Sequence, residues 1–342
     1  MDLLPTDEQS EIVATVRSQL ESDFSLNDLA ARDGEASIID PGLWARCAEL
    51  GWFALGLAES DGGIGYGLVE EALLFGELGA HCTPGPFLAT VLAAHVAAAS
   101  GSAELVEKVI SGEVRVALVE PDGGGQGSPS LTPGAVHGTF RATDYGDAQL
   151  GLALSGDQAA VVSLEDAAAN PVASLDPLVP LATVELDTAP LAFSDDPATG
   201  LRATILTAAL LAGIAKATAE QSTEYAKDRE QFGRPVGSFQ AVKHRCADMA
   251  VRADAAEQLT HLAALAVAGG HDDDQFQAEA ARVVAADAAI ANAEVNVQNH
   301  GGIGFTWEHT AHRYVTRARM WNSSAGDRRS HLSAFLAEQA PA

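Results

Sequence analysis

The stretch DREQFGRPVGSFQ, residues 228–240, interrupts a long helical pattern and decides how the last third of the chain is interpreted. A helix is expected to stop at Phe232-Gly233, because glycine readily ends a helix, and a turn containing proline and glycine follows. Arg229 offers a two-pronged guanidinium to a pyrophosphate, and Phe232 offers a packing face. From the residues alone, the segment is either a ligand-binding turn or a helical hairpin turn with a surface arginine.

A second stretch, NHGGIGFTWEH at residues 299–309, follows a helix predicted over about 275–298. Gly301 stands where a left-handed residue commonly ends a helix. The other glycines indicate close approach of a ligand or of a neighbouring backbone. Neither this cluster nor the glycines of residues 61–67 has G-x-G-x-x-G spacing after a strand, so a Rossmann-type dinucleotide site is not supported.

Working outward, the chain divides into a helical zone (1–112), a strand-rich zone (113–195) and a second helical zone (196–342). Thr6 and Gln9 have the spacing of a capping box at the first helix. In the middle zone, strands are predicted at residues 114–119, 158–163 and 182–186. Strands without intervening helices predict an antiparallel β domain, so the fold class is α+β.

Composition restricts the function. The formal net charge of −27 disfavours binding to nucleic acids and to anionic membranes, and no apolar run of membrane-spanning length is evident. Three distant cysteines give no disulfide framework or CxxC metal site, and the polar N-terminus is not a signal peptide; both fit the cytoplasm. The acidic triplet at residues 272–274 is interpreted as a helix start rather than a metal site. No metal is therefore expected.

The two composite motifs identify a resemblance. R-x-Q-F-G-R-P-V-x-x-F-Q, followed some sixty residues later by Q-x-H-G-G-x-G-F-x-x-E, resembles the acyl-CoA dehydrogenase family of flavoproteins. Residues 50–65 and 116–121 are also similar to that family, so the resemblance extends over the whole chain. It implies a helical domain, a middle antiparallel β-barrel domain and a C-terminal four-helix bundle, the order of the three zones above.

The resemblance also implies a cofactor site. In the family, these two turns contact the adenosine and pyrophosphate of the FAD that is bound to the adjacent subunit. Carried over, the contacts are Arg229, Phe232, Gln298, Gly301 and Gly302. Glycines at such places let the backbone approach phosphate oxygens.

The family reaction is α,β-desaturation of an acyl-CoA, in which a carboxylate removes the α-proton while a hydride passes to the flavin. The usual glutamate aligns with Ala325. Other family members place the base on the first long helix of the C-terminal domain, and that position aligns with Leu201. Asp327, two residues from the first position, is the candidate base. Glu308 is a weaker candidate, since a carboxylate at a helix start commonly pairs with a nearby His or Arg.

The chain also lacks the family's W-I-[TS]-N segment, and residues 122–128, which follow Glu120-Pro121, replace the expected G-S-D loop. The sequence therefore resembles the short actinobacterial-type subunit without the usual catalytic glutamate. That resemblance implies one subunit of an α2β2 enzyme acting in fatty-acid or steroid side-chain degradation. An electron-transferring flavoprotein is the expected electron acceptor. The alternatives are a self-sufficient homotetramer with a displaced base and a non-catalytic scaffold.

Overall fold

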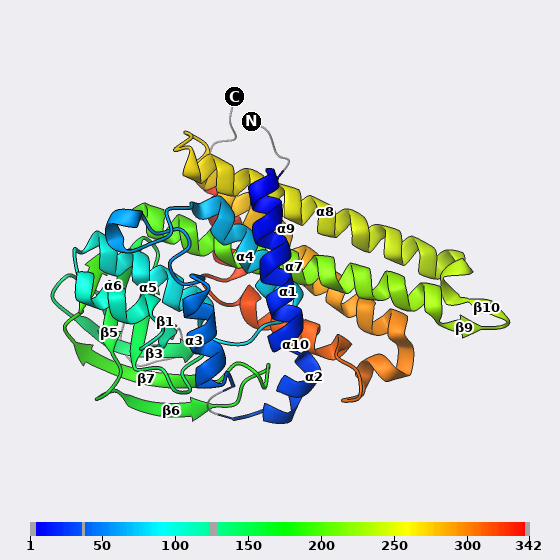
Figure 1. The fold of residues 1–342 in the computed structure, drawn as a ribbon, viewed down its shortest axis with the longest axis horizontal. Helices are drawn as coiled ribbons and strands as arrows, with labels where there is room; N and C mark the ends of the chain where they lie inside the picture. The colour runs from blue at the N-terminus through cyan, green and yellow to red at the C-terminus, as the bar shows by residue number, and fades with distance from the viewer. Residues whose placement is uncertain (1–4, 36–37, 123–128, 339–342) are drawn as a thin grey trace. The chain divides into compact units, whose positions relative to one another are not determined.

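The computed structural model describes residues 5–35, 38–122 and 129–338 (Figure 1). The element order is helical, then strand-rich, then helical, which confirms the predicted fold class. The chain forms two compact units. A helical unit comprises the residues up to Asn27, Ala72–Thr83 and those from Thr204 on, and a sheet unit comprises Asp28–Glu71 and Pro84–Ala203.

The helices and short 3-10 turns before the strands begin with a confirmed capping box, in which the Thr6 hydroxyl accepts from the Gln9 backbone and the Gln9 side chain accepts from the Thr6 backbone. The elements are α1 (Asp7–Asp23), α2 (Leu26–Leu29), η1 (Ala30–Arg32), α3 (Pro41–Glu49), η2 (Glu59–Asp61), α4 (Leu68–Ala80), α5 (Phe87–Ala99) and α6 (Ala103–Ile110).

One sheet holds eight strands, in the order β6-β7-β3-β1-β4-β5-β8, with β2 beside β3. Their bounds are β1 (Val116–Pro121), β2 (Ser130–Leu131), β3 (Val136–Thr143), β4 (Leu150–Ser155), β5 (Gln158–Ser163), β6 (Ala168–Val172), β7 (Leu181–Thr188) and β8 (Ala192–Ser194). Of the strands predicted from sequence, 158–163 is reproduced, and the other two are shifted or lengthened by one or two residues.

The prediction of a purely antiparallel domain was wrong at one pair, because β1 and β4 run parallel, with Leu118 opposite Leu152. β3 is antiparallel to β1. The connection after β3 then reverses the chain and places β4 on the other side of β1, so β4 must share the direction of β1. The described ladders end at β6 and β8 without joining, although β2 approaches β5, so the sheet curls without closing into a hydrogen-bonded barrel.

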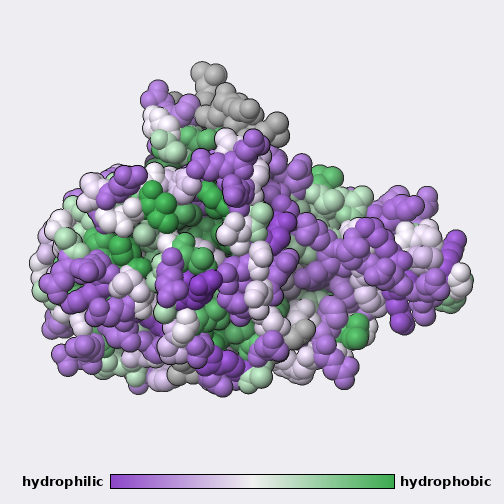
Figure 2. All heavy atoms as spheres, viewed as in Figure 1, coloured by the Kyte–Doolittle hydropathy of each residue, from purple (hydrophilic) through white to green (hydrophobic). Residues whose placement is uncertain are grey.

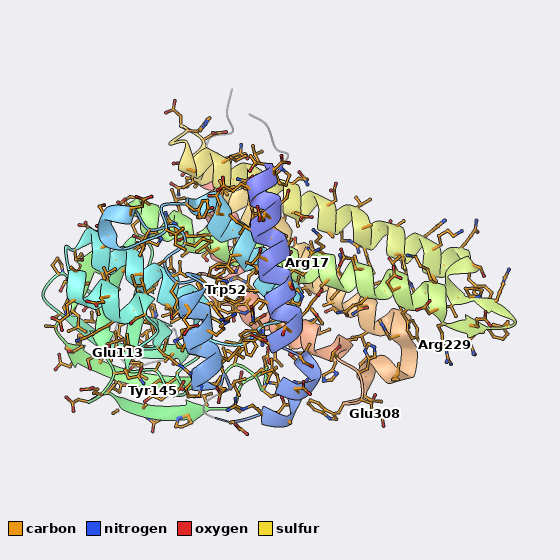
Figure 3. All side chains as sticks on the ribbon, in the orientation of Figure 1. Arg17, Trp52, Glu113, Tyr145, Arg229 and Glu308 are labelled. Atoms are coloured by element: carbon orange, nitrogen blue, oxygen red, sulfur yellow. The ribbon has the colours of Figure 1, made fainter. Side chains whose placement is uncertain are left out.

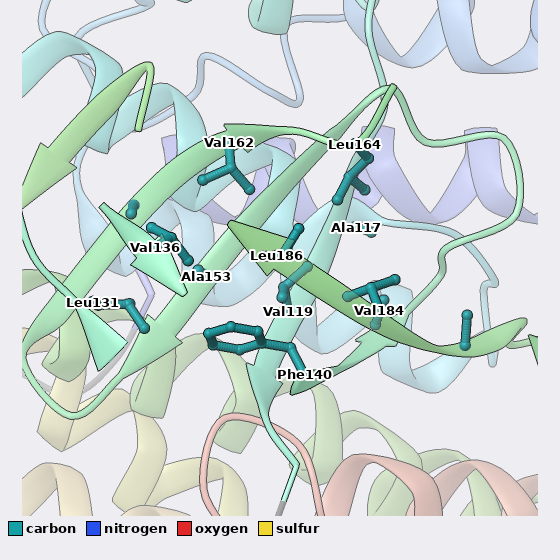
Figure 4. Packing of buried hydrophobic residues seen from close by; sticks show 13 residues of the cluster. Ala117, Val119, Leu131, Val136, Phe140, Ala153, Val162, Leu164, Val184 and Leu186 are labelled. Carbon is teal, nitrogen blue, oxygen red and sulfur yellow. The ribbon is translucent and has the colours of Figure 1, made fainter. Parts of the chain in front are cut away.

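The core of the sheet unit lies against the concave side of this sheet (Figure 4). Phe140, Val119, Val162 and Val184 are fully buried there, together with small residues such as Ala153. Alternating residues of β1, β3, β5 and β7 supply most of this core, because successive side chains of a strand point to opposite faces.

The helical unit is built on long helices that follow the strands: α7 (Pro197–Asp228), α8 (Gln240–Ala268), α9 (Asp274–His300), η4 (Gly301–Phe305), α10 (Ala311–Asn322) and α11 (Arg328–Ala337). The buried Asn292 amide of α9 donates to the carbonyl oxygens of Ala215 on α7 and Met249 on α8, at 3.0 and 2.9 Å. One side chain therefore ties three helices together, which supports the predicted bundle.

Alanine and glycine let these helices pack closely. A Cβ at Gly213 would lie 1.9 Å from the Gly76 carbonyl oxygen, and one at Gly79 would lie 1.9 Å from that of Leu210. The most apolar 18-residue stretch of α7 is long enough to cross a membrane, contrary to the expectation from the sequence. However, 72% of that stretch is buried inside the protein, as in a core helix.

The acidic triplet lies where the sequence predicted. Asp273 is the N-cap of α9, and its carboxylate accepts from the Gln277 side chain at 2.9 Å. Across the described ranges, no group of three or more His, Cys, Asp or Glu side chains is arranged to hold a metal ion.

Candidate functional site

The hairpin after α7 carries an aromatic residue with a strained backbone and an exposed side chain. β9 (Glu230–Gln231) pairs with β10 (Arg234–Pro235), and the two residues between them have positive φ angles, +55° at Phe232 and +75° at Gly233. Glycine adopts this conformation freely, but a bulky residue rarely does. The Phe232 side chain is also 92% exposed. Strain and exposure together are typical of a residue kept for binding rather than for packing.

Arg229 stands at the base of the hairpin. Its backbone N–H donates to Tyr225 at 2.9 Å, and its carbonyl oxygen accepts from Val236 at 2.7 Å. The residue itself is exposed. The backbone is thus fixed at both groups, while the guanidinium faces solvent and is positioned for an anionic ligand.

The glycine turn after α9 answers why so many glycines occur together. Gly301 has a φ of +66°, and its N–H donates to the Gln298 carbonyl oxygen. Gly304 is buried, and a Cβ there would lie 2.8 Å from the Val297 carbonyl oxygen. No atom lies within 4 Å of a Cβ placed on Gly301 or Gly302. The chain itself therefore requires glycine at 301 and 304, whereas Gly302 leaves its backbone open to an approaching molecule.

The two turns lie at the same end of the long helices, where Figure 3 places Arg229 and Glu308. Tyr225 of α7 stacks on His300 of α9 with ring centroids 4.3 Å apart, and its hydroxyl donates to the His300 carbonyl oxygen at 3.4 Å. One turn of helix earlier, Ser222 donates to Asn296 at 2.9 Å. These contacts fix the base of one turn against the base of the other.

All five residues predicted to contact FAD lie in this end region and are exposed, including Gln298. Three apolar side chains of the glycine turn are exposed as well: Ile303 at 43%, Phe305 at 76% and Trp307 at 71%. In the view of Figure 2, the surface over α8 and the hairpin is otherwise mostly hydrophilic. An exposed guanidinium, an exposed ring and two open glycines fit the pyrophosphate and adenosine of FAD.

The loop at residues 323–327 holds no carboxylate at the position where the family resemblance implied one. Ala325 is buried with a φ of +53°, and Gly326 has a φ of +87°. Asp327 is the N-cap of α11, and its carboxylate accepts from the Ser330 backbone N–H at 2.8 Å. That hydrogen bond lowers the pKa of the exposed Asp327 carboxyl. The structure thus gives Asp327 a capping function, and a lowered pKa makes a carboxylate a weaker base.

The same loop is held in place by α9. One terminal nitrogen, Nη2, of the fully buried Arg282 guanidinium lies 3.0–3.3 Å from the carbonyl oxygens of Trp321, Asn322, Ser324 and Gly326, so its two N–H bonds are shared among four acceptors. His331 of α11 bonds the Ala325 carbonyl oxygen at 2.8 Å and Glu279 of α9 at 2.7 Å.

The second position considered for a base lies in the sheet unit. Leu201 is half-buried, and its neighbour Arg202 forms an ion pair with Glu71, which also accepts from His95 at 2.8 Å. Burial opposes the charge of Glu71, but the hydrogen bond from His95 and the charge of Arg202 hold its pKa below the usual value. Sequence reasoning missed this network, although a glutamate on a helix as apolar as α4 was a signal.

The comparisons with known proteins agree with this arrangement. Residues 6–115 match the acyl-CoA dehydrogenase N-terminal domain, and residues 202–337 match the acyl-CoA dehydrogenase C-terminal domain. Acyl-CoA dehydrogenase FadE34 of Mycobacterium tuberculosis is 36% identical over 92% of this chain, which spans only 45% of that longer protein. Three shorter mycobacterial acyl-CoA dehydrogenases are 30% to 36% identical, and the chain covers 80% to 88% of each.

Two solved structures are similar over nearly the whole chain. A chain of the ChsE4-ChsE5 complex from Mycobacterium tuberculosis superimposes on this chain with a TM-score of 0.86 at 25% identity. The match covers 100% of this chain and 100% of that chain. A steroid acyl-CoA dehydrogenase, Tcur3481-Tcur3483, gives a TM-score of 0.81 at 25% identity over 96% of each. The motifs, the fold and these relatives lead to one conclusion: the chain belongs to the acyl-CoA dehydrogenase family.

Proposed function

We propose that the chain is one subunit of a heteromeric, FAD-dependent acyl-CoA dehydrogenase, of α2β2 composition, that desaturates a bulky acyl-CoA such as a steroid side-chain thioester. The observation that carries the proposal is an asymmetry. The five residues proposed to contact FAD lie together and exposed at the end of α7 and α9, while the two aligned base positions are Ala325 and Leu201. The solved relatives that are complexes of two chains support the same interpretation.

Each FAD-facing residue has a separate task in this proposal. Arg229 binds the pyrophosphate through charge-assisted hydrogen bonds, and Gly302 presents its backbone without a side chain in the way. Phe232 packs against the adenosine. FAD, when bound, supplies the acceptor for the hydride that leaves the β-carbon. The carboxylate that takes the α-proton then comes from the sister chain.

The middle domain is the other half of the asymmetry. It contains no tryptophan, and the loop at residues 122–128 that replaces the family's G-S-D segment lies, except for Asp122, outside the described residues. The sister chain is therefore proposed to hold the flavin ring and the thioester. An electron-transferring flavoprotein as acceptor and a cytoplasmic location belong to the same proposal.

The first experiment measures the FAD-to-chain ratio and the native mass of the protein purified alone and after co-expression with a sister dehydrogenase chain. We expect little FAD in the chain alone. In the complex we expect about one FAD per two chains, because each flavin needs one half-site from each subunit. About one FAD per chain in a homotetramer would overturn the proposal, and a complex without any flavin would favour a scaffold.

Substituting Asp327→Asn separates the heteromer from a self-sufficient enzyme. In the complete complex we expect turnover within about twofold of the wild type, because asparagine also caps helices well. A catalytic base at Asp327 predicts a loss on the order of a hundredfold or more. Turnover under saturating acyl-CoA, with an artificial electron acceptor, decides between them.

A further inference from the structure

We propose that His309 is a positioning residue. As a neutral imidazole it holds the glycine turn between α9 and α10 against both helices, and it releases the turn when protonated. The turn in question comprises residues 301–310. His309 lies eight residues beyond Gly301, just outside the second of the two motifs that carry the proposed FAD contacts. Its contacts reach both helices that flank the turn.

The first contact is a row of three rings that are tilted against one another, with interplanar angles of 34° and 43°. Tyr225 lies over His300 and His300 lies over His309, with ring centroids 4.3 Å apart in each pair. The His300 imidazole is oriented by its Nδ1, which lies 2.8 Å from the Asn296 carbonyl oxygen. Since a carbonyl oxygen only accepts, Nδ1 of His300 carries the proton. The turn is therefore folded back onto the end of α9 through His309.

The second contact caps a helix. The backbone N–H of Ala311, the first residue of α10, donates to Nδ1 of His309 at 3.1 Å, while the N-cap residue Thr310 makes no capping hydrogen bond with its side chain. An Nδ1 that accepts a hydrogen bond is unprotonated, so the proton of neutral His309 lies on Nε2. Adding a second proton at Nδ1 breaks this hydrogen bond.

The surroundings make the cation of His309 unfavourable. The positive end of the α10 dipole faces it. From α10 the charge of His312 also acts on it, and the next residue, Arg313, has its guanidinium over Trp307 of the same turn. From α9 it is faced by His300, which also contacts Tyr225 of α7, and its chain neighbour Glu308 is exposed.

These groups agree with the direction in which the imidazoles titrate. Burial lowers the pKa of His309, and the charges of His300 and His312 lower it further; burial also lowers the pKa of His300. A histidine pKa that is lower in the folded state stabilises the folded state fully above the unfolded pKa of about 6.5. The stabilisation is lost as the pH falls below that value, so the contacts that His309 makes with His300 and Ala311 weaken under mildly acidic conditions.

The test measures hydrogen–deuterium exchange in the full-length chain, for peptides covering residues 299–314, at pH 7.5 and 5.5, after correction for the intrinsic exchange rate. In the wild type we expect protection to fall about three- to fivefold at pH 5.5, the size of an unfavourable charge at a helix terminus. In His309→Asn, which can cap but not titrate, the loss of protection at pH 5.5 should shrink to the part that His300 contributes.

Two variants complete the design. His309→Phe keeps a stacking ring and loses the cap, so its protection should be reduced at both pH values. His312→Asn removes the neighbouring imidazole but leaves the cap, and its exchange should still respond to pH. A wild type without a pH response, or a response of unchanged size in His309→Asn, would overturn the proposal.

A second readout rests on the proposed function. In the flavin-loaded complex, FAD release followed by flavin fluorescence should be faster at pH 5.5 in the wild type but not in His309→Asn. The exchange measurement needs no flavin. A chain that never binds FAD would therefore refute the proposed function without affecting the test of His309.

Discussion

An Arg229→Ala variant is expected to lose about nine-tenths or more of its FAD when the co-expressed complex is purified. Arg229 is exposed, and its backbone is anchored at both the N–H and the carbonyl group, so removing the side chain leaves the hairpin intact. A charge-assisted hydrogen bond contributes roughly 1.5–3 kcal/mol, which corresponds to a tenfold to hundredfold rise in Kd for FAD. The ratio of flavin absorbance to protein, together with FAD titration of the stripped complex, measures the effect.

The matched control is Lys227→Ala. Lys227 lies two residues earlier on α7, is exposed and forms an ion pair with Glu224 on the same helix. This substitution changes the net charge by the same amount without touching the proposed pyrophosphate contact, so FAD should be retained. Equal loss in both variants would mean that Arg229 acts only through the overall charge.

Arg282→Met is expected to have the largest effect on stability, lowering the free energy of unfolding by about 3–5 kcal/mol. Methionine has a similar length but no donors, so the carbonyl oxygens of residues 321–326 that Arg282 binds would lose their buried partner. Each buried acceptor left without a donor costs about 1–3 kcal/mol before the loop relaxes. Urea unfolding with an unchanged m-value measures the loss.

Arg319→Met is the control for this substitution. Arg319 of α10 forms an exposed ion pair with Glu294 of α9, and a pair of this kind contributes about 0–1 kcal/mol. The two variants remove the same charge from neighbouring parts of the bundle. Similar losses of stability would show that the buried contacts of Arg282 are not what holds the loop.

Several features could be predicted because they depend on neighbours in the sequence. The Thr6–Gln9 box and the acidic start of α9 both act within one helical turn, so spacing alone identified them. The need for glycine at 301 follows from its place after the last turn of a helix. The start of α8 is not marked in this way, because its N-cap residue is Phe239 and no side chain caps it.

Strand prediction failed for a different reason. β3 and β4 were missed, since their sequences mix small and polar residues, and their strand form is set by pairing with β7 and β1. A sheet partner can lie anywhere in the chain, so propensity along one segment does not identify it. The parallel pairing of β1 with β4 follows from the path of the whole sheet.

The sequence by itself determined the helical, strand-rich, helical order, the two turns proposed to carry the FAD contacts, and the absence of a carboxylate at positions 201 and 325. All of these are local patterns or single residue identities. The tertiary structure alone decided that Glu71 meets His95 and Arg202, that Arg282 binds the loop before α11, and that His309 stacks on His300 while capping α10. Glu71 and Arg202 are 131 positions apart. Contacts of that kind depend on how separate elements pack, because a buried polar group takes whichever partner the fold brings within hydrogen-bonding distance.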